Sequence, residues 1–255
     1  MTICVYCRVI TDGDTTKAHV FPEALGNRDL ILPAGTECRK CNHYFGHELD
    51  SAIATHPNVA MALLYLDVKG KQKTPRKMLG SVERKLSEPG TSTLNFSIDR
   101  PKLTFTAEGG VEFESVVKVP SGFRLSCFRR GLHHVATSIV AYHEGPEAVL
   151  DARFDPVRNY IRRPRTRSQA WSYLDDSPPL KQIPAVVWGG EVAVNNGKII
   201  AMQFFQTVYV VDLLNSGELI KLAAEKKVKL IGPDVAKLPD IVIKGGARPE
   251  APPAA

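Results

Sequence analysis

The sequence predicts an α+β fold, with a small cysteine-rich unit at the N-terminus and a larger region of helices and antiparallel strands after it. Two Cys-x-x-Cys pairs lie at 4–7 and 38–41. Helical spacing of apolar residues and β-type alternation follow one another along the rest of the chain. The turn Asn195-Asn196-Gly197 between two apolar runs is typical of a β-hairpin. A chain of 255 residues has room for one large domain or two smaller ones.

The first helix is expected over residues 42–66, where Phe45, Leu49 and Ile53 recur every three to four positions and Pro57 interrupts the pattern. Residues 67–92 are polar, basic and broken by Gly and Pro. This composition indicates an exposed basic linker, with a short helix at 77–86. The N-terminal domain is therefore expected to cover residues 1–66.

The region 93–244 is expected to form an α+β domain. Its residues 93–119 alternate between apolar and polar side chains around Glu108-Gly109-Gly110, which predicts a β-hairpin. Three helices and two paired strands are predicted after it: helices at 124–144, 153–162 and 216–227, and strands at 183–194 and 198–214. The Gly- and Pro-rich end, 245–255, has the composition of a disordered tail.

Composition and charge limit the possible locations and partners. No apolar run approaches the ~18 residues of a membrane helix, and the N-terminus lacks a basic start followed by an apolar stretch. We therefore expect a cytoplasmic protein with no membrane partner. A net charge of +6 and a pI of about 9.0 favour a polyanionic partner, but many basic proteins bind no nucleic acid.

The paired cysteines predict a metal site. In a cytosolic chain, Cys4, Cys7, Cys38 and Cys41 point to metal binding rather than to disulfides. Four thiolates suit the tetrahedral coordination of Zn²⁺, and the ion would stabilise a unit too short to have much core of its own. The alternative is four reduced thiols without metal. Cys127 lies on the apolar face of a predicted helix, which indicates core packing.

Three sequence motifs occur in a fixed order around these cysteines. KAHVFPEALG at 17–26 lies between the pairs, CRKCN at 38–42 opens the first helix, and FG and LD follow at 45–46 and 49–50. Together with the first pair, this order resembles the HNH endonuclease family, in its four-cysteine zinc-binding branch, over about residues 3–55. The resemblance implies a ββα-metal fold that hydrolyses phosphodiester bonds in DNA, with RNA not excluded. It also implies the roles that such domains often have in restriction, phage defence or mobile elements.

The resemblance assigns a role to two polar residues. Phosphodiester hydrolysis needs a base that activates water and a cation that stabilises the developing negative charge. His19 is the implied base, and histidine has an unperturbed pKa near neutrality. Asn42 is the implied ligand of the catalytic divalent ion, Mg²⁺ or Mn²⁺. The alternatives are a core-edge histidine in a plain zinc knuckle, and an asparagine that only caps the helix.

Position 18 departs from the family. The family usually has Asp or Glu directly before the histidine as a metal ligand, and this chain has Ala18. Three explanations are open: a natural variant with weakened activity or a substitute ligand, a binding protein without catalysis, or a residue engineered to silence a nuclease. The intact remainder of the motif favours the third. Glu23, Glu37 and Asp50 are the candidate substitute ligands.

Basic tracts suggest contact with a phosphate backbone. Lysines and arginines are frequent over residues 69–85 and 153–167, and five arginines of the second tract are the expected nucleic-acid ligands: Arg158, Arg162, Arg163, Arg165 and Arg167. An ordinary solvated surface is the alternative. Two other functions compete with an HNH endonuclease. One is a non-catalytic zinc-knuckle nucleic-acid-binding protein, and the other is an interaction module in which zinc only stabilises the fold.

Overall fold

The computed structural model describes the chain in several ranges. Backbone and side chains are described over 2–13, 16–56, 124–163, 189–205 and 207–226 and at 59, 63 and 68, and further strands contribute their backbone. The chain divides into two compact units, one made of residues 1–73 with 123–235 and the other of residues 74–122 with 236–255. The predicted α+β class is confirmed, since helices and antiparallel sheets make up the described chain.

The N-terminal segment is mostly loop, and short backbone pairings hold it together. Single antiparallel bridges join Ile3 to Ile10 and His19 to Ile31, and the second makes a short hairpin between the cysteine pairs. A 3-10 turn, η1 (Glu23–Leu25), follows His19. Three helical stretches then continue one another: α1 (Arg39–Phe45), the π-helix η2 (Gly46–Asp50) and α2 (Ser51–Ala54).

The first helix starts three residues earlier than the sequence predicts. Cys38 is its N-cap and Arg39 its first residue, so Asn42 lies inside the helix and the alternative of Asn42 as the cap is wrong. The apolar spacing begins only at Phe45 and therefore says nothing about the first turn. Pro57 lies outside the described residues.

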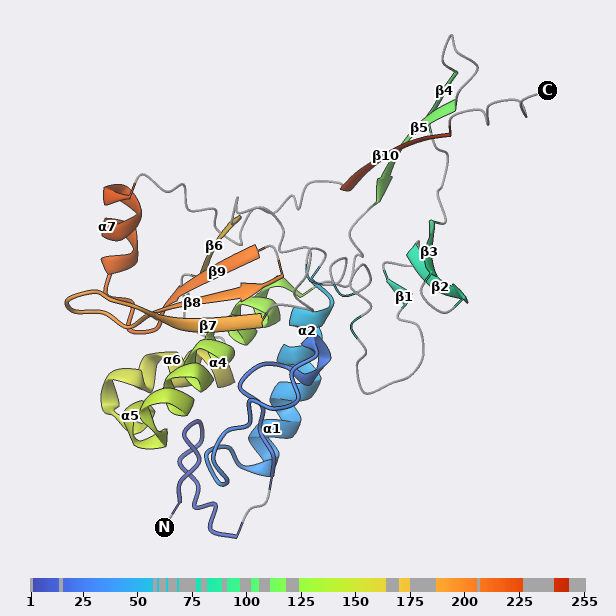
Figure 1. Cartoon of the computed structure of the whole chain (residues 1–255). Helices are drawn as coiled ribbons and strands as arrows, with labels where there is room; N and C mark the ends of the chain where they lie inside the picture. The colour runs from blue at the N-terminus through green and yellow to red at the C-terminus, as the bar shows by residue number, and fades with distance from the viewer. Residues whose placement is uncertain are drawn as a thin grey trace. The chain divides into compact units, whose positions relative to one another are not determined.

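A four-stranded antiparallel sheet forms the second layer of the first unit, in the order β6-β9-β8-β7 (Figure 1). The strands are β6 (Ala170–Leu174), β7 (Val187–Val192), β8 (Ile199–Phe204) and β9 (Thr207–Asp212). The predicted hairpin at Asn195-Asn196-Gly197 is confirmed as the β7–β8 connection. The strand predicted over 198–214 is instead two paired strands, with Phe205 in the left-handed region (φ 59°) between them.

Side chains on the β8–β9 hairpin alternate between two buried faces. Met202 and Tyr209 belong to the main core, whereas Ala201 and Val208 pack with Leu219 of α7 (Glu218–Glu225) on the other face. This alternation follows from the two-residue period of a strand. Helix α4 (Leu125–Glu144) packs against the sheet, and α5 (Pro146–Leu150), η3 (Ala152–Phe154) and α6 (Asp155–Arg162) follow it.

One core joins the N-terminal segment to α4. Phe45, Leu49 and Ile53 are buried in the same cluster as Phe128 and Leu132 of α4. Full burial of each such side chain contributes about 1.5–3 kcal/mol. The close approach needs a small residue in α4, because a Cβ on Gly131 would lie 2.9 Å from Cδ1 of Ile53. The two compact units divide at 73/74, 122/123 and 235/236. The domain bounds expected at 66 and 92, and the role expected for each segment, stay predictions.

The second unit contains two three-stranded antiparallel sheets. One has the order β1-β2-β3, with β1 (Lys77–Met78), β2 (Val82–Glu88) and β3 (Thr91–Phe96), and the other has the order β10-β5-β4, with β4 (Lys102–Phe105), β5 (Val111–Val117) and β10 (Ile241–Ala247). The hairpin predicted within 93–119 is confirmed by β4 and β5.

Two sequence-based expectations fail in this second unit. The short helix expected at 77–86 is wrong, because β1 and β2 pair there. The tail expected to be disordered from 245 instead contributes Gly245, Gly246 and Ala247 to β10, where they pair with β5. Sheet pairing outweighs the low strand propensity of glycine in this case. The rest of the tail lies outside the described residues. Among the described helices, none combines the length and the apolar character needed to cross a membrane.

Candidate metal centre and active site

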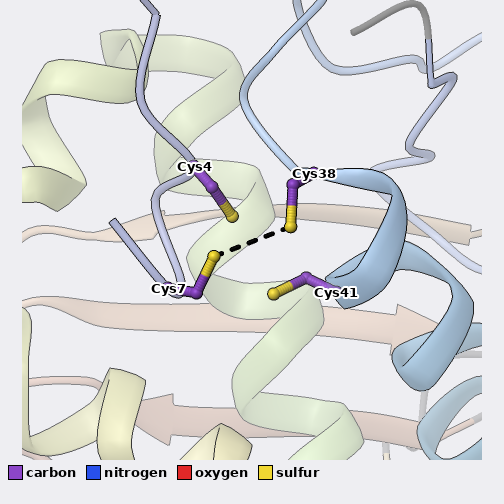
Figure 2. A group of neighbouring side chains, drawn as sticks. All are labelled: Cys4, Cys7, Cys38 and Cys41. Atoms are coloured by element: carbon purple, nitrogen blue, oxygen red, sulfur yellow. Dashed lines mark hydrogen bonds between the residues drawn. The ribbon is translucent and has the colours of Figure 1, made fainter. Parts of the chain in front are cut away.

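The four paired cysteines come together in space. Their sulfur atoms all lie within 4.8 Å of one another, and Sγ of Cys7 lies 3.6 Å from Sγ of Cys38. Figure 2 shows the four sulfurs turned toward a common centre, from the N-terminal loop on one side and the start of α1 on the other. A zinc ion with bonds of about 2.3 Å to four sulfurs needs sulfur–sulfur separations of about 3.8 Å. The geometry therefore fits a structural zinc ion.

The protonation of the thiols supports a cation at this place. A hydrogen bond from Cys41 lowers the pKa of Cys4 to about 4, and the same contact raises the pKa of Cys41. Burial, followed by the charge of Cys4, raises the pKa of Cys7 to about 11. Thiolates at these distances repel one another, so a negative charge on one thiol disfavours the deprotonation of the others. A divalent cation removes that repulsion and binds the thiolates.

Backbone contacts fix the first cysteine pair. The amide of Cys4 donates to the carbonyl of Val9 at 2.9 Å, and Arg8 adopts the left-handed conformation (φ 60°) that turns the chain back. The amide of Val5 donates to the carbonyl of Thr36 at 2.9 Å, which brings the first pair beside the second. These contacts position the first cysteine pair beside the second.

A buried polar network connects this centre to α4. Glu37, directly before Cys38, lies 3.3 Å from Nε2 of His134 through Oε2, and both side chains are buried. The hydroxyl of Tyr6 lies 3.0 Å from Oγ of Ser138 and 3.3 Å from the carbonyl of His134. Tyr6, Phe45 and His134 also pack ring against ring, with centroids 4.4–5.1 Å apart.

The Glu37–His134 pair is buried, and each side chain changes the pKa of the other. Burial alone would lower the pKa of His134, but the hydrogen bond and the charge of Glu37 outweigh it and raise that pKa. Burial raises the pKa of Glu37, and the contact with His134 offsets only part of the effect. A buried charge that loses its partner is costly, so each of these side chains depends on the other.

His19 is held on the short hairpin between the cysteine pairs. It forms the bridge with Ile31, and the backbone hydrogen bonds Val20 to Leu30 (2.9 Å) and Leu32 to Ala18 (2.8 Å) flank it. The His19 side chain is 21% exposed, and its Nε2 lies 3.8 Å from Oε2 of Glu23. The imidazole is therefore accessible to a substrate while its backbone is fixed.

Asn42 lies in the second turn of the helix, one residue after Cys41. Its Nδ2 donates to the carbonyl of Lys17 at 3.2 Å, two residues before His19. This bond ties α1 to the strand that carries His19. Because the amide nitrogen is the donor here, Oδ1 is the atom that could bind a cation.

Ala18 faces the interior. Its side chain is 3% exposed and belongs to the main core cluster. The position before the histidine thus adds a methyl group to the core, where the family usually has a carboxylate. A carboxylate at this position would require compensation by a cation or a hydrogen-bond donor.

One expected phosphate ligand is wrong. Arg158 is 3% exposed and donates to the carbonyls of Val149 and Asp151 and to the carboxylate of Asp155. Its guanidinium joins α6 to the preceding turns and is not presented to a ligand. The sequence gives no sign of this, because a buried arginine and an exposed one look the same in a basic tract. Arg163 is exposed and Arg162 half-buried, whereas Arg165 and Arg167 lie outside the described residues.

The sequence gives no sign that Glu37, His134 and Tyr6 form a set. Glu37 and His134 are separated by 97 positions. No spacing rule connects such residues, and in the helix predicted at 124–144 His134 lies outside the face formed by Phe128, Leu132, Val135 and Ile139.

Comparison with known proteins identifies the N-terminal segment. The family model described as HNH endonuclease matches residues 4–58, which contain all four clustered cysteines, His19 and Asn42. The resemblance is thereby confirmed for this segment, and the match supports a nuclease-type function with a nucleic-acid substrate. Neither the curated proteins nor the solved structures contain a significant match to the chain.

Proposed function

We propose that this chain is a metal-dependent HNH endonuclease that hydrolyses phosphodiester bonds in DNA. The observation that carries the proposal is that the cysteine-stapled unit fixes the backbone of both His19 and Asn42. The helix that carries Asn42 begins at the metal centre, and the amide of Asn42 is bonded to the carbonyl of Lys17, close to His19. The backbone of His19 is also paired with that of Ile31. The backbone positions from which both side chains extend are therefore fixed.

His19 acts as the general base in this proposal. Its imidazole takes a proton from water, the water oxygen attacks the phosphorus, and the bond to the 3′ oxygen breaks. When bound, Mg²⁺ or Mn²⁺ would stabilise the negative charge on the leaving oxygen and on the phosphoryl group. Asn42 would contribute Oδ1 as a neutral ligand of that ion, and its bond to the carbonyl of Lys17 keeps α1 against the short hairpin. A site that holds both groups before the substrate arrives needs little rearrangement during the reaction.

Cleavage of plasmid DNA and of RNA by the zinc-loaded full chain, with Mg²⁺ and then Mn²⁺, tests this function. We expect metal-dependent nicking of DNA that His19→Ala reduces by at least about 100-fold, the lower range for general-base catalysis. His47→Ala is the matched control, because His47 is 75% exposed and pairs with Glu48 rather than with the site. If the protein binds DNA but cleaves neither polymer with either ion, a non-catalytic binding role replaces the nuclease.

A further inference from the structure

Three acidic residues of the N-terminal segment could replace the carboxylate that position 18 lacks, and the structure separates them. Glu37 is buried against His134. Asp50 is the last residue of η2, and its charge contributes to the raised pKa of His134. Glu23 lies beside His19, with 3.8 Å between Oε2 of Glu23 and Nε2 of His19.

The loop that carries Glu23 is held rigidly by its own residues. Glu23 opens the turn η1, which Gly26 ends in the left-handed conformation (φ 89°) with its amide donating to the carbonyl of Glu23. Leu25 anchors the turn in the core with 1% exposure. The side chain of Asn27 closes the loop. Its Nδ2 donates to the carbonyls of Phe21 and Leu30, and its Oδ1 accepts from the backbone amide of Leu30. The backbone of Glu23 is thus fixed relative to the strand of His19.

The exposure and spacing of Glu23 suit a ligand. Its side chain is 28% exposed, so a cation and a substrate phosphate can reach it, whereas Ala18 faces the core. A separation of 3.8 Å from His19 is longer than a hydrogen bond, so the carboxylate need not consume the nitrogen that takes the proton from water. Mg²⁺ and Mn²⁺ prefer oxygen ligands, and carboxylates above others.

We propose that Glu23 supplies the carboxylate ligand of the catalytic divalent ion, with Asn42 as a second ligand, in place of the acidic residue missing at position 18. This inference rests on the proposed nuclease function and specifies its metal site. It also favours one of the explanations for Ala18, namely a natural variant in which the ligand has moved from the strand to the turn that follows it.

Direct measurement of Mn²⁺ binding to the zinc-loaded full chain, by electron paramagnetic resonance, tests the assignment without activity. Glu23→Gln keeps the side-chain shape and removes the charge, and we expect it to weaken Mn²⁺ binding at least tenfold. Asp29→Asn is the matched control, because Asp29 is an exposed carboxylate of the same loop and its loss should leave the affinity within about twofold. Glu23→Asp keeps a carboxylate and should fall between the parent and Glu23→Gln. Zinc content and melting temperature report whether each variant is folded.

A measurement on the unsubstituted protein removes any dependence on how the variants fold. Substoichiometric Mn²⁺ should broaden the NMR signals of Glu23 and Asn42 before those of Glu147 and Asp151, two acidic residues in and directly after α5. Equal Mn²⁺ affinity in the parent and in Glu23→Gln, an equal loss in Asp29→Asn, or no Mn²⁺ binding by the parent would each overturn the assignment. If Mn²⁺ binds through Glu23 but no DNA or RNA is cleaved, the metal site stands and the nuclease proposal fails. If Glu23→Gln cleaves DNA as well as the parent does, the nuclease proposal stands and the assignment of Glu23 as the metal ligand fails.

Discussion

Oε2 of Glu37 lies 3.3 Å from Nε2 of His134, so a residue next to one of the clustered cysteines is paired with the middle of α4 across 97 positions of sequence. The pair is buried on both sides. It connects the nuclease-like segment to the region whose role the sequence leaves open. The metal centre and α4 are therefore expected to be stable or unstable together.

The first prediction concerns this pair. His134→Ala should lower the free energy of unfolding by about 3–5 kcal/mol, because it leaves the buried Glu37 without its partner. Glu37→Gln should cost less, since a neutral amide can still hydrogen bond to the imidazole. Urea denaturation of the zinc-loaded proteins measures both. Similar stability of His134→Ala and the parent would show that the pair contributes nothing.

Zinc is expected at one ion per chain. Cys38→Ser should lose that ion and unfold the N-terminal segment, because the metal holds the two cysteine pairs together. Elemental analysis and circular dichroism check this, with Cys127→Ser as the control: Cys127 is buried in the core away from the cluster, and the variant should keep its zinc. Protein purified without chelators that lacks stoichiometric zinc would contradict the assignment of the four ligands.

The stability of the protein should decrease as the pH falls, because of two buried histidines outside the metal centre. Burial lowers the pKa of His56 and of His133 to about 4. Above pH 6.5 both are neutral in the folded and unfolded chain and pH has no effect through them. Below 6.5 the unfolded chain binds protons that the folded chain excludes, so stability is lost as the pH falls from 6.5 toward 4.

Each histidine should contribute up to about 1.4 kcal/mol per pH unit in that window. His133→Gln removes one titrating group and retains a donor for the carbonyl of Arg129, which Nδ1 of His133 contacts at 2.8 Å. Denaturation between pH 7 and 5 should therefore give a shallower loss for this variant than for the parent. Any loss caused by protonation of the zinc ligands is common to both proteins, so an identical slope would contradict the shift.

The arginines at the end of α6 and in the chain that follows it are predicted to bind the phosphate backbone. A combined Arg162→Ala, Arg163→Ala and Arg165→Ala variant should bind DNA more weakly and with a less steep salt dependence, by about one unit of slope for each phosphate that is no longer neutralised. Arg158 is left unchanged, because its buried guanidinium supports the fold. A salt series of filter-binding measurements decides, and an unchanged slope would make this tract ordinary surface.

A carboxylate at position 18 should compensate for the loss of Glu23. In the Glu23→Gln background, Ala18→Asp is expected to raise metal-dependent cleavage at least tenfold, which corresponds to about 1.4 kcal/mol. The same change should lower the melting temperature without divalent ions, because residue 18 is buried and an unpaired carboxylate is costly there. Adding His19→Ala should abolish the gain. A folded double variant without gain would show that position 18 cannot replace position 23.

The sequence by itself determined the local features of this protein. Fixed spacing identified the four cysteines, and the ordered motifs around His19 and Asn42 identified the HNH segment, because ligand geometry and chain reach depend on near neighbours. Periodicity likewise predicted α4 and the β7–β8 and β4–β5 hairpins. It failed at 77–86, where short strands are formed by pairing rather than by propensity.

Only the tertiary structure decided the features that depend on distant partners. It buried Arg158 inside the expected basic surface, paired Glu37 with His134, and placed Glu23 beside His19. It also joined the N-terminal segment and α4 in one core. The physical reason is that burial and the choice of charge partners are set by packing between segments far apart in the chain, and local spacing carries no information about that packing.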